Sequence, residues 1–138
     1  MQLMKTGRKT KMMNGKTNKI AFEELFDSQA KNQDLLISKG SYKGFASKEI
    51  ECVPVDDPRL CSYHVQQLVS EIGEVLEADK RWKNFRNERY DKEAKLDEIA
   101  DCFIVAMNVS MFSGFTGEEV ANAIKRKIDE VHERISGT

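Results

Sequence analysis

The chain has 138 residues, of which 33% are charged and 40% hydrophobic, with two prolines and a formal net charge of −1. This length predicts one domain with its own core, and the composition favours a helical, soluble protein. No uninterrupted apolar run approaches 18 residues, which excludes a membrane-spanning helix and argues against a membrane partner. The three cysteines follow no metal-ligand spacing and indicate reduced thiols in a cytoplasmic protein.

The charge is distributed unevenly along the chain. Residues 1–19 contain six basic residues and no acid, whereas the remainder has 16 basic and 23 acidic residues. We predict a basic, weakly structured arm over residues 1–18 and a single all-α domain over residues 19–138. The arm is either a solvated tail or a contact for nucleic acid. The acidic body argues against a nucleic-acid partner, because contacts to phosphate dominate such binding.

The first predicted helix begins where apolar residues start to recur at helical spacing, near Ile20. It is expected to end near Lys39, with Gly40 as its C-terminal stop. Residues 40–60 contain both prolines and the turn-like sequence Asp56-Asp57-Pro58, and they predict a long loop insertion. Loops of this length are often lids or flexible insertions.

The second predicted helix runs from about Ser62 to Lys83. The third begins at Asp91, a residue suited to the N-cap, and continues to about Ser113. Its stretch from residue 99 to 112 is apolar almost all round. Such a helix is expected in the centre of a bundle or at an oligomer interface.

The fourth predicted helix follows Gly114 and starts with a capping box, in which Thr116 is the N-cap and Glu119 stands three residues on. It continues to about Ile135. Four amphipathic helices with short later connections predict an antiparallel four-helix bundle. The apolar third helix needs more cover than three neighbours supply, so we expect a homodimer or homotetramer.

Two pairs of acids carry most of the functional information. Glu71 and Glu74 lie three residues apart in the second helix, and Glu98 and Asp101 repeat this spacing in the third. Residues three apart on a helix are neighbours, so two adjacent helices would gather four carboxylates in one place. Oxygen-rich clusters of this kind suit Mg²⁺ or Mn²⁺.

The two pairs differ in how strongly they indicate a site. Glu71 and Glu74 alone also fit a solvated helix face. Asp101 is the only charged residue between Ile99 and Phe112, and burying an unpaired carboxylate costs several kcal/mol. It therefore requires either a cation or a basic partner, for which Arg81 and Lys125 are candidates.

Other residues form weaker candidates for substrate binding. Trp82, Lys83 and Phe85 stand near the end of the second helix, where they would either pack or hold a base and a phosphate. The last helix has a basic edge that would either be solvated or neutralise phosphates. Its members are Lys125, Lys127, His132 and Arg134. There is no phosphate-binding glycine-rich loop and no nucleophile elbow.

These motifs resemble those of the all-α nucleoside triphosphate pyrophosphatases, which include MazG-like proteins and dimeric dUTPases. Residues 68–74 are similar to the family's Glu-Glu-x-x-Glu motif, with Ser70 in place of its first glutamate, and residues 98–101 match its Glu-x-x-Asp motif. Residues 82–85 look like the aromatic–Lys–x–aromatic segment of the dUTPase branch. The last helix resembles the family's Lys-(x)n-Asn-x-x-Arg element, with Val131 at the asparagine position.

The resemblance implies hydrolysis of a (deoxy)nucleoside triphosphate, such as dUTP or another pyrimidine or non-canonical nucleotide, to the monophosphate and pyrophosphate. It implies that the four acids hold Mg²⁺, with Glu74 or Glu71 also acting as the catalytic base. Substrate contacts would come from the first helix, the end of the second helix and the last helix. The implied residues are Gln29, Asn32, Trp82, Lys83, Phe85, Lys127, His132 and Arg134. The family also pairs subunits to complete its bundle.

Two other classes compete with this interpretation. A ferritin-like dinuclear carboxylate protein needs two Glu-x-x-His pairs, and this chain offers only residues 129–132, which begin with Asp. A non-enzymatic helical interaction module would retain the acidic motif without activity.

Overall fold

The computed structural model describes residues 19–83 and 89–137. These residues form four α-helices: α2 (Phe22–Ser38), α3 (Pro58–Ala78), α4 (Lys92–Met111) and α5 (Gly117–Ile135). A short 3-10 helix, η1 (Lys80–Trp82), follows α3. Within the described residues there is no strand beyond a single bridge between Asp56 and Ser113. The all-α prediction is therefore confirmed, whereas the predicted basic arm lies outside the described residues.

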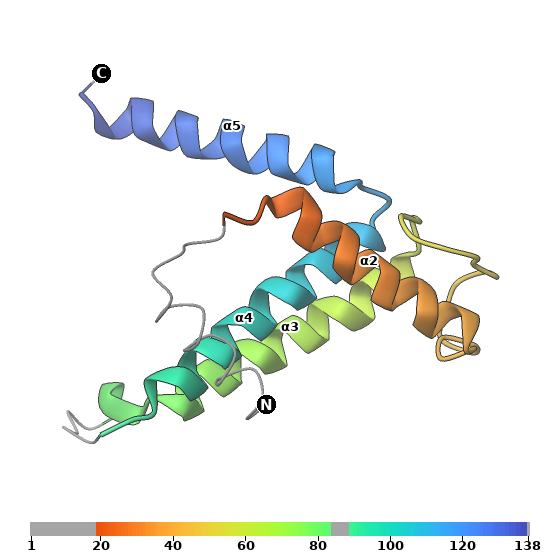
Figure 1. The fold of residues 1–138 in the computed structure, drawn as a ribbon, viewed down its shortest axis with the longest axis horizontal. Helices are drawn as coiled ribbons and strands as arrows, with labels where there is room; N and C mark the ends of the chain where they lie inside the picture. Colours follow the sequence, from red (N-terminus) through yellow and green to blue (C-terminus); the bar gives the residue numbers. More distant parts are fainter. Residues whose placement is uncertain (1–18, 84–88, 138) are drawn as a thin grey trace.

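Helices α3 and α4 form an antiparallel hairpin, and α2 crosses one end of it (Figure 1). Helix α5 contacts α2 near its own start, where Gly117 lies against the ring of Phe26. From there α5 extends away from the hairpin (Figure 1). A single chain therefore does not close the four helices into a bundle.

The core lies at the end of the hairpin that α2 crosses. It is built from six buried apolar residues, contributed by α2, the loop before α3, α3 and the end of α4. They are Phe26, Val53, Leu60, Met107, Met111 and Phe112. His64 is also buried here and stacks on Phe112 with 4.9 Å between ring centroids.

The predicted bounds of the second helix are wrong at both ends. The helix begins four residues early because Asp57 caps it, accepting hydrogen bonds from the backbone amides of Arg59 and Leu60, and Pro58 is well placed at its first position. It ends at Ala78 because Asp79 takes an extended conformation (φ −143°, ψ 101°). Trp82 consequently belongs to η1 rather than to this helix.

The loop predicted over residues 40–60 is shorter than expected, since its last three residues are helical. It is fixed to the core end of the hairpin. The Val55 amide donates to the Met111 carbonyl, and the Val53 amide donates to the Asp34 carboxylate at 2.8 Å. The loop therefore packs over the core end, where α2 crosses the hairpin.

The other predicted helix ends agree closely with the structure. Asp91 caps α4 and Thr116 forms the expected capping box with Glu119. Gly40 and Gly114 both have positive φ, 77° and 86°, just after the ends of α2 and α4. None of the helices in the described ranges is long and apolar enough to cross a membrane.

Candidate metal centre on the hairpin

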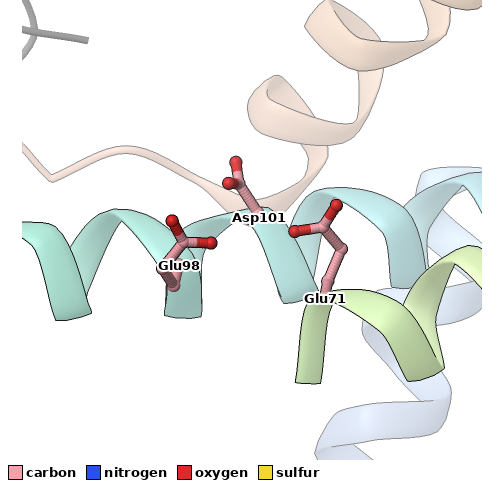
Figure 2. A group of neighbouring side chains, drawn as sticks. All are labelled: Glu71, Glu98 and Asp101. Atoms are coloured by element: carbon pink, nitrogen blue, oxygen red, sulfur yellow. The ribbon is translucent and has the colours of Figure 1, made fainter. Parts of the chain in front are cut away.

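Three of the four predicted carboxylates come together midway along the hairpin. Glu71 on α3 and Glu98 and Asp101 on α4, here called the acidic triad, each have an oxygen within 4.8 Å of the others. Figure 2 shows the three side chains on one side of the two helices. Glu74 is exposed and lies outside this group.

The helices position the triad through simple spacing. Glu98 and Asp101 are one turn apart on α4, and the antiparallel packing of α3 brings Glu71 beside them. All three residues are partly buried. Within the described residues, no lysine, arginine or histidine forms an ion pair with the triad. Neither Arg81 nor Lys125 is the partner of Asp101, since they pair with Asp79 and Asp129.

The surroundings of the two triad residues on α4 disfavour their ionised state. Burial raises the pKa of Glu98, and the neighbouring carboxylates of Asp101, Glu74, Glu71 and Asp97 raise it further. The pKa of Asp101 is raised by burial and then by Asp97. Carboxylates that repel one another in this way are stabilised by a cation placed among them.

The donor set fits a hard divalent cation. Mg²⁺ takes oxygen ligands at about 2.1 Å and retains several waters, so three carboxylates suffice as the protein's share. Oxygens already within 4.8 Å of one another need only small side-chain rotations to share an ion. The residues that would hold Mg²⁺ or Mn²⁺ are therefore the acidic triad, with Glu74 one turn from Glu71.

A cavity of about 430 Å³ lies at the end of the hairpin where α3 leads into α4. Its lining begins one turn beyond Glu71, at Val75, and one turn before Glu98, at Lys95. The indole of Trp82 forms part of it, with its N–H donating to the Leu76 carbonyl at 3.1 Å. The cavity is therefore close to the triad along the same helix pair. Lys83 is exposed after η1, and Phe85 lies outside the described residues.

The predicted residues on α2 form a polar chain that reaches α4. The Asn32 amide donates to Gln29 Oε1 at 3.1 Å, and Gln29 Nε2 donates to Asn108 Oδ1 at 3.0 Å. Asn108 is buried on α4, two turns beyond Asp101. We did not predict this residue, although a polar side chain within the apolar run was a visible signal.

The structure does not bring the basic edge of α5 to the triad within one chain. Lys127, His132 and Arg134 are exposed on the part of α5 that extends away (Figure 1). Lys127 forms an ion pair with Glu130 at 3.3 Å. No protein-family model, curated protein or solved structure matches this chain. The function is therefore inferred from the residues of the site.

Proposed function

We propose that the protein is a Mg²⁺-dependent nucleoside triphosphate pyrophosphohydrolase. The observation that carries this proposal is the acidic triad: both acidic motifs contribute to it, and its oxygens lie within 4.8 Å of one another with no basic partner among the described residues. The combination of Glu-x-x-Glu and Glu-x-x-Asp on two packed helices is the same pair of motifs that resembles the all-α pyrophosphatases.

The position of each acidic residue indicates its role in the proposed reaction. The triad holds the cation, and a bound Mg²⁺ would offset the phosphate charge and lower the pKa of a nearby water. Glu74, exposed one turn along α3, takes a proton from the attacking water. The water oxygen bonds to the α-phosphorus as the bond from that phosphorus to the bridging oxygen breaks, and pyrophosphate leaves.

The cavity beside the triad supports a nucleotide substrate. Trp82 offers an aromatic face for a base. Arg81 and Lys95 also line the cavity, where both pair with Asp79. Lys83 is placed just after this aromatic residue, where it would contact a phosphate. A screen of nucleoside triphosphates would identify the base that the protein prefers.

The direct test is pyrophosphate release from a panel of ribo- and deoxyribonucleoside triphosphates with Mg²⁺. We expect turnover of at least one of them by the wild type, and loss of about a thousandfold or more in Glu98→Gln or Asp101→Asn. Glu77→Gln is the matched control, because Glu77 lies on α3 outside the triad and pairs with Lys80. Wild-type turnover by Glu98→Gln, or no turnover of any substrate by the wild type, would contradict the proposal.

We also propose that a second copy of the chain covers the exposed apolar faces. Helix α5 is strongly amphipathic, yet its apolar side is open, with Ile128 58% and Ile135 77% exposed. A hollow of about 800 Å³ lies along this side. On the hairpin, Phe103 and Val69 are each 65% exposed. Exposed patches of this extent are typical of interfaces.

Light scattering tests this association. We expect the wild type to be a dimer or tetramer, and Ile128→Glu to shift it towards monomer because the substitution places a charge in the apolar interface. Lys125→Glu on the same helix is the control, since Lys125 is exposed on its polar side. A monomeric wild type at micromolar concentration would contradict the assembly but leave the metal centre untouched.

A further inference from the structure

Asp79 is a buried carboxylate that the proposed mechanism does not use. It follows α3 directly, and its side chain is only 7% exposed. The Arg81 guanidinium donates to it twice, at 2.9 and 2.8 Å, and the Lys95 ammonium donates at 2.8 Å. Asp79 therefore joins the end of α3 to the first turns of α4.

Lys95 lies close enough to the acidic triad to interfere with it. It precedes Glu98 by three residues on α4, and side chains at this spacing are neighbours on the helix surface. Its ammonium instead points to Asp79 and lies 5.4 Å from the centre of the Tyr90 ring. The other cation, Arg81, stacks on the same ring at 3.9 Å.

The surroundings of Glu98 agree with this arrangement. Glu71 and Asp101 each have an oxygen within 4.8 Å of one of its own, whereas the Lys95 ammonium is bonded to Asp79. A free ammonium beside Glu98 would occupy the negative site that a divalent cation requires. An ammonium and a carboxylate on neighbouring side chains attract each other strongly enough for Lys95 to compete with the divalent cation, even when solvent partly screens them.

We propose that Asp79 is a positioning residue for the metal centre: by holding the Lys95 ammonium, it keeps positive charge away from Glu98 and preserves the affinity of the acidic triad for a divalent cation. This inference rests on the proposed function, because it requires that the triad bind a cation. It assigns Asp79 a role beyond joining two helices.

The test is titration calorimetry of Mn²⁺ into the full-length protein at about 0.15 M salt, where long-range effects are screened. We expect Asp79→Asn to bind Mn²⁺ about tenfold more weakly than the wild type, because Lys95 is released towards Glu98. The double variant Asp79→Asn/Lys95→Met should recover wild-type affinity to within about twofold. A purely structural role for Asp79 predicts no recovery, since the link between the helices is still missing.

A matched control separates local release of Lys95 from a change in net charge. Asp79→Asn/Lys92→Met has the same net charge as the rescuing double variant, but removes a lysine one turn earlier on α4 and leaves Lys95 in place. It should remain about tenfold weaker. Recovery by this control, or wild-type affinity in Asp79→Asn, would overturn the role of Asp79.

If circular dichroism shows that Asp79→Asn does not fold, the single variant Lys95→Met still tests the proposal. Its affinity should stay within about twofold of the wild type, because the ammonium that it removes is already held away from the triad. A fall of tenfold in this variant would overturn the proposal. Absence of Mn²⁺ binding by the wild type would instead overturn the metal centre itself.

Discussion

The core end and the middle of the α3/α4 hairpin are built differently. At the core end, Leu60, Met111 and Phe112 are completely buried. The buried Asp57 carboxylate there accepts hydrogen bonds from the amide and hydroxyl of Ser47 and from the amide of Leu60. Midway along the hairpin, by contrast, the acidic triad is only partly buried and apolar residues such as Val69 remain exposed. The contrast indicates that the core end supplies stability and leaves the middle free to carry charges that would otherwise be costly.

The largest effect should come from breaking the core end. Phe112→Ala removes a fully buried ring that packs against His64 and Tyr42. We expect the free energy of unfolding to fall by about 3–5 kcal/mol, from lost burial and the cavity left behind. Urea unfolding followed by circular dichroism measures it. A loss below about 1 kcal/mol would mean that this end is not the main source of stability.

A pH-dependent effect should also come from the core end. Burial lowers the pKa of His64 to about 4, against 6.5 for an ordinary histidine. The unfolded chain then binds a proton more readily, so stability is complete above about pH 6.5 and falls as the pH drops towards 4. Between pH 7 and 4 the wild type should lose up to about 3 kcal/mol more than His64→Leu, as urea unfolding at both pH values would show. Equal losses in the two proteins would contradict this assignment.

The smallest effect on stability should come from the middle of the hairpin. With divalent cations removed by chelation, Glu98→Gln relieves repulsion within the triad. The raised pKa of Glu98 means that the penalty is present only above its titration range and disappears as the pH falls through it. At pH 7 the free energy of unfolding should rise by no more than about 0.5 kcal/mol, because the site is partly solvated. Destabilisation by more than about 1 kcal/mol would show that Glu98 is structural.

Most of the helix ends that were predicted accurately are determined by local signals. Capping residues such as Asp91 and Thr116 determine helix starts by bonding to amides within three residues, and Gly114 adopts the positive φ that ends a helix. The Asp57-Pro58 pair is also a local start signal, but its neighbours made it resemble a turn. The spacing of the acids was enough to predict that Glu71, Glu98 and Asp101 would meet.

Contacts between distant residues could not be predicted in this way. The pairing of the Val55 amide with the Met111 carbonyl depends on how the loop folds back on the core. The bond between Gln29 and Asn108 depends on where α2 crosses α4. The helical period of the last helix predicts its apolar face. It does not predict that α5 extends away from the hairpin, because the direction of the helix depends on which surface packs against that face.

The central claim is that the acidic triad binds a divalent cation. Crystals grown with MnCl₂ and measured at a wavelength where manganese scatters anomalously test it directly. We expect an anomalous difference peak among the carboxylates of Glu71, Glu98 and Asp101 in the wild type, and no peak in Asp101→Asn. A wild-type map with manganese only elsewhere, or with none at all, would contradict the claim.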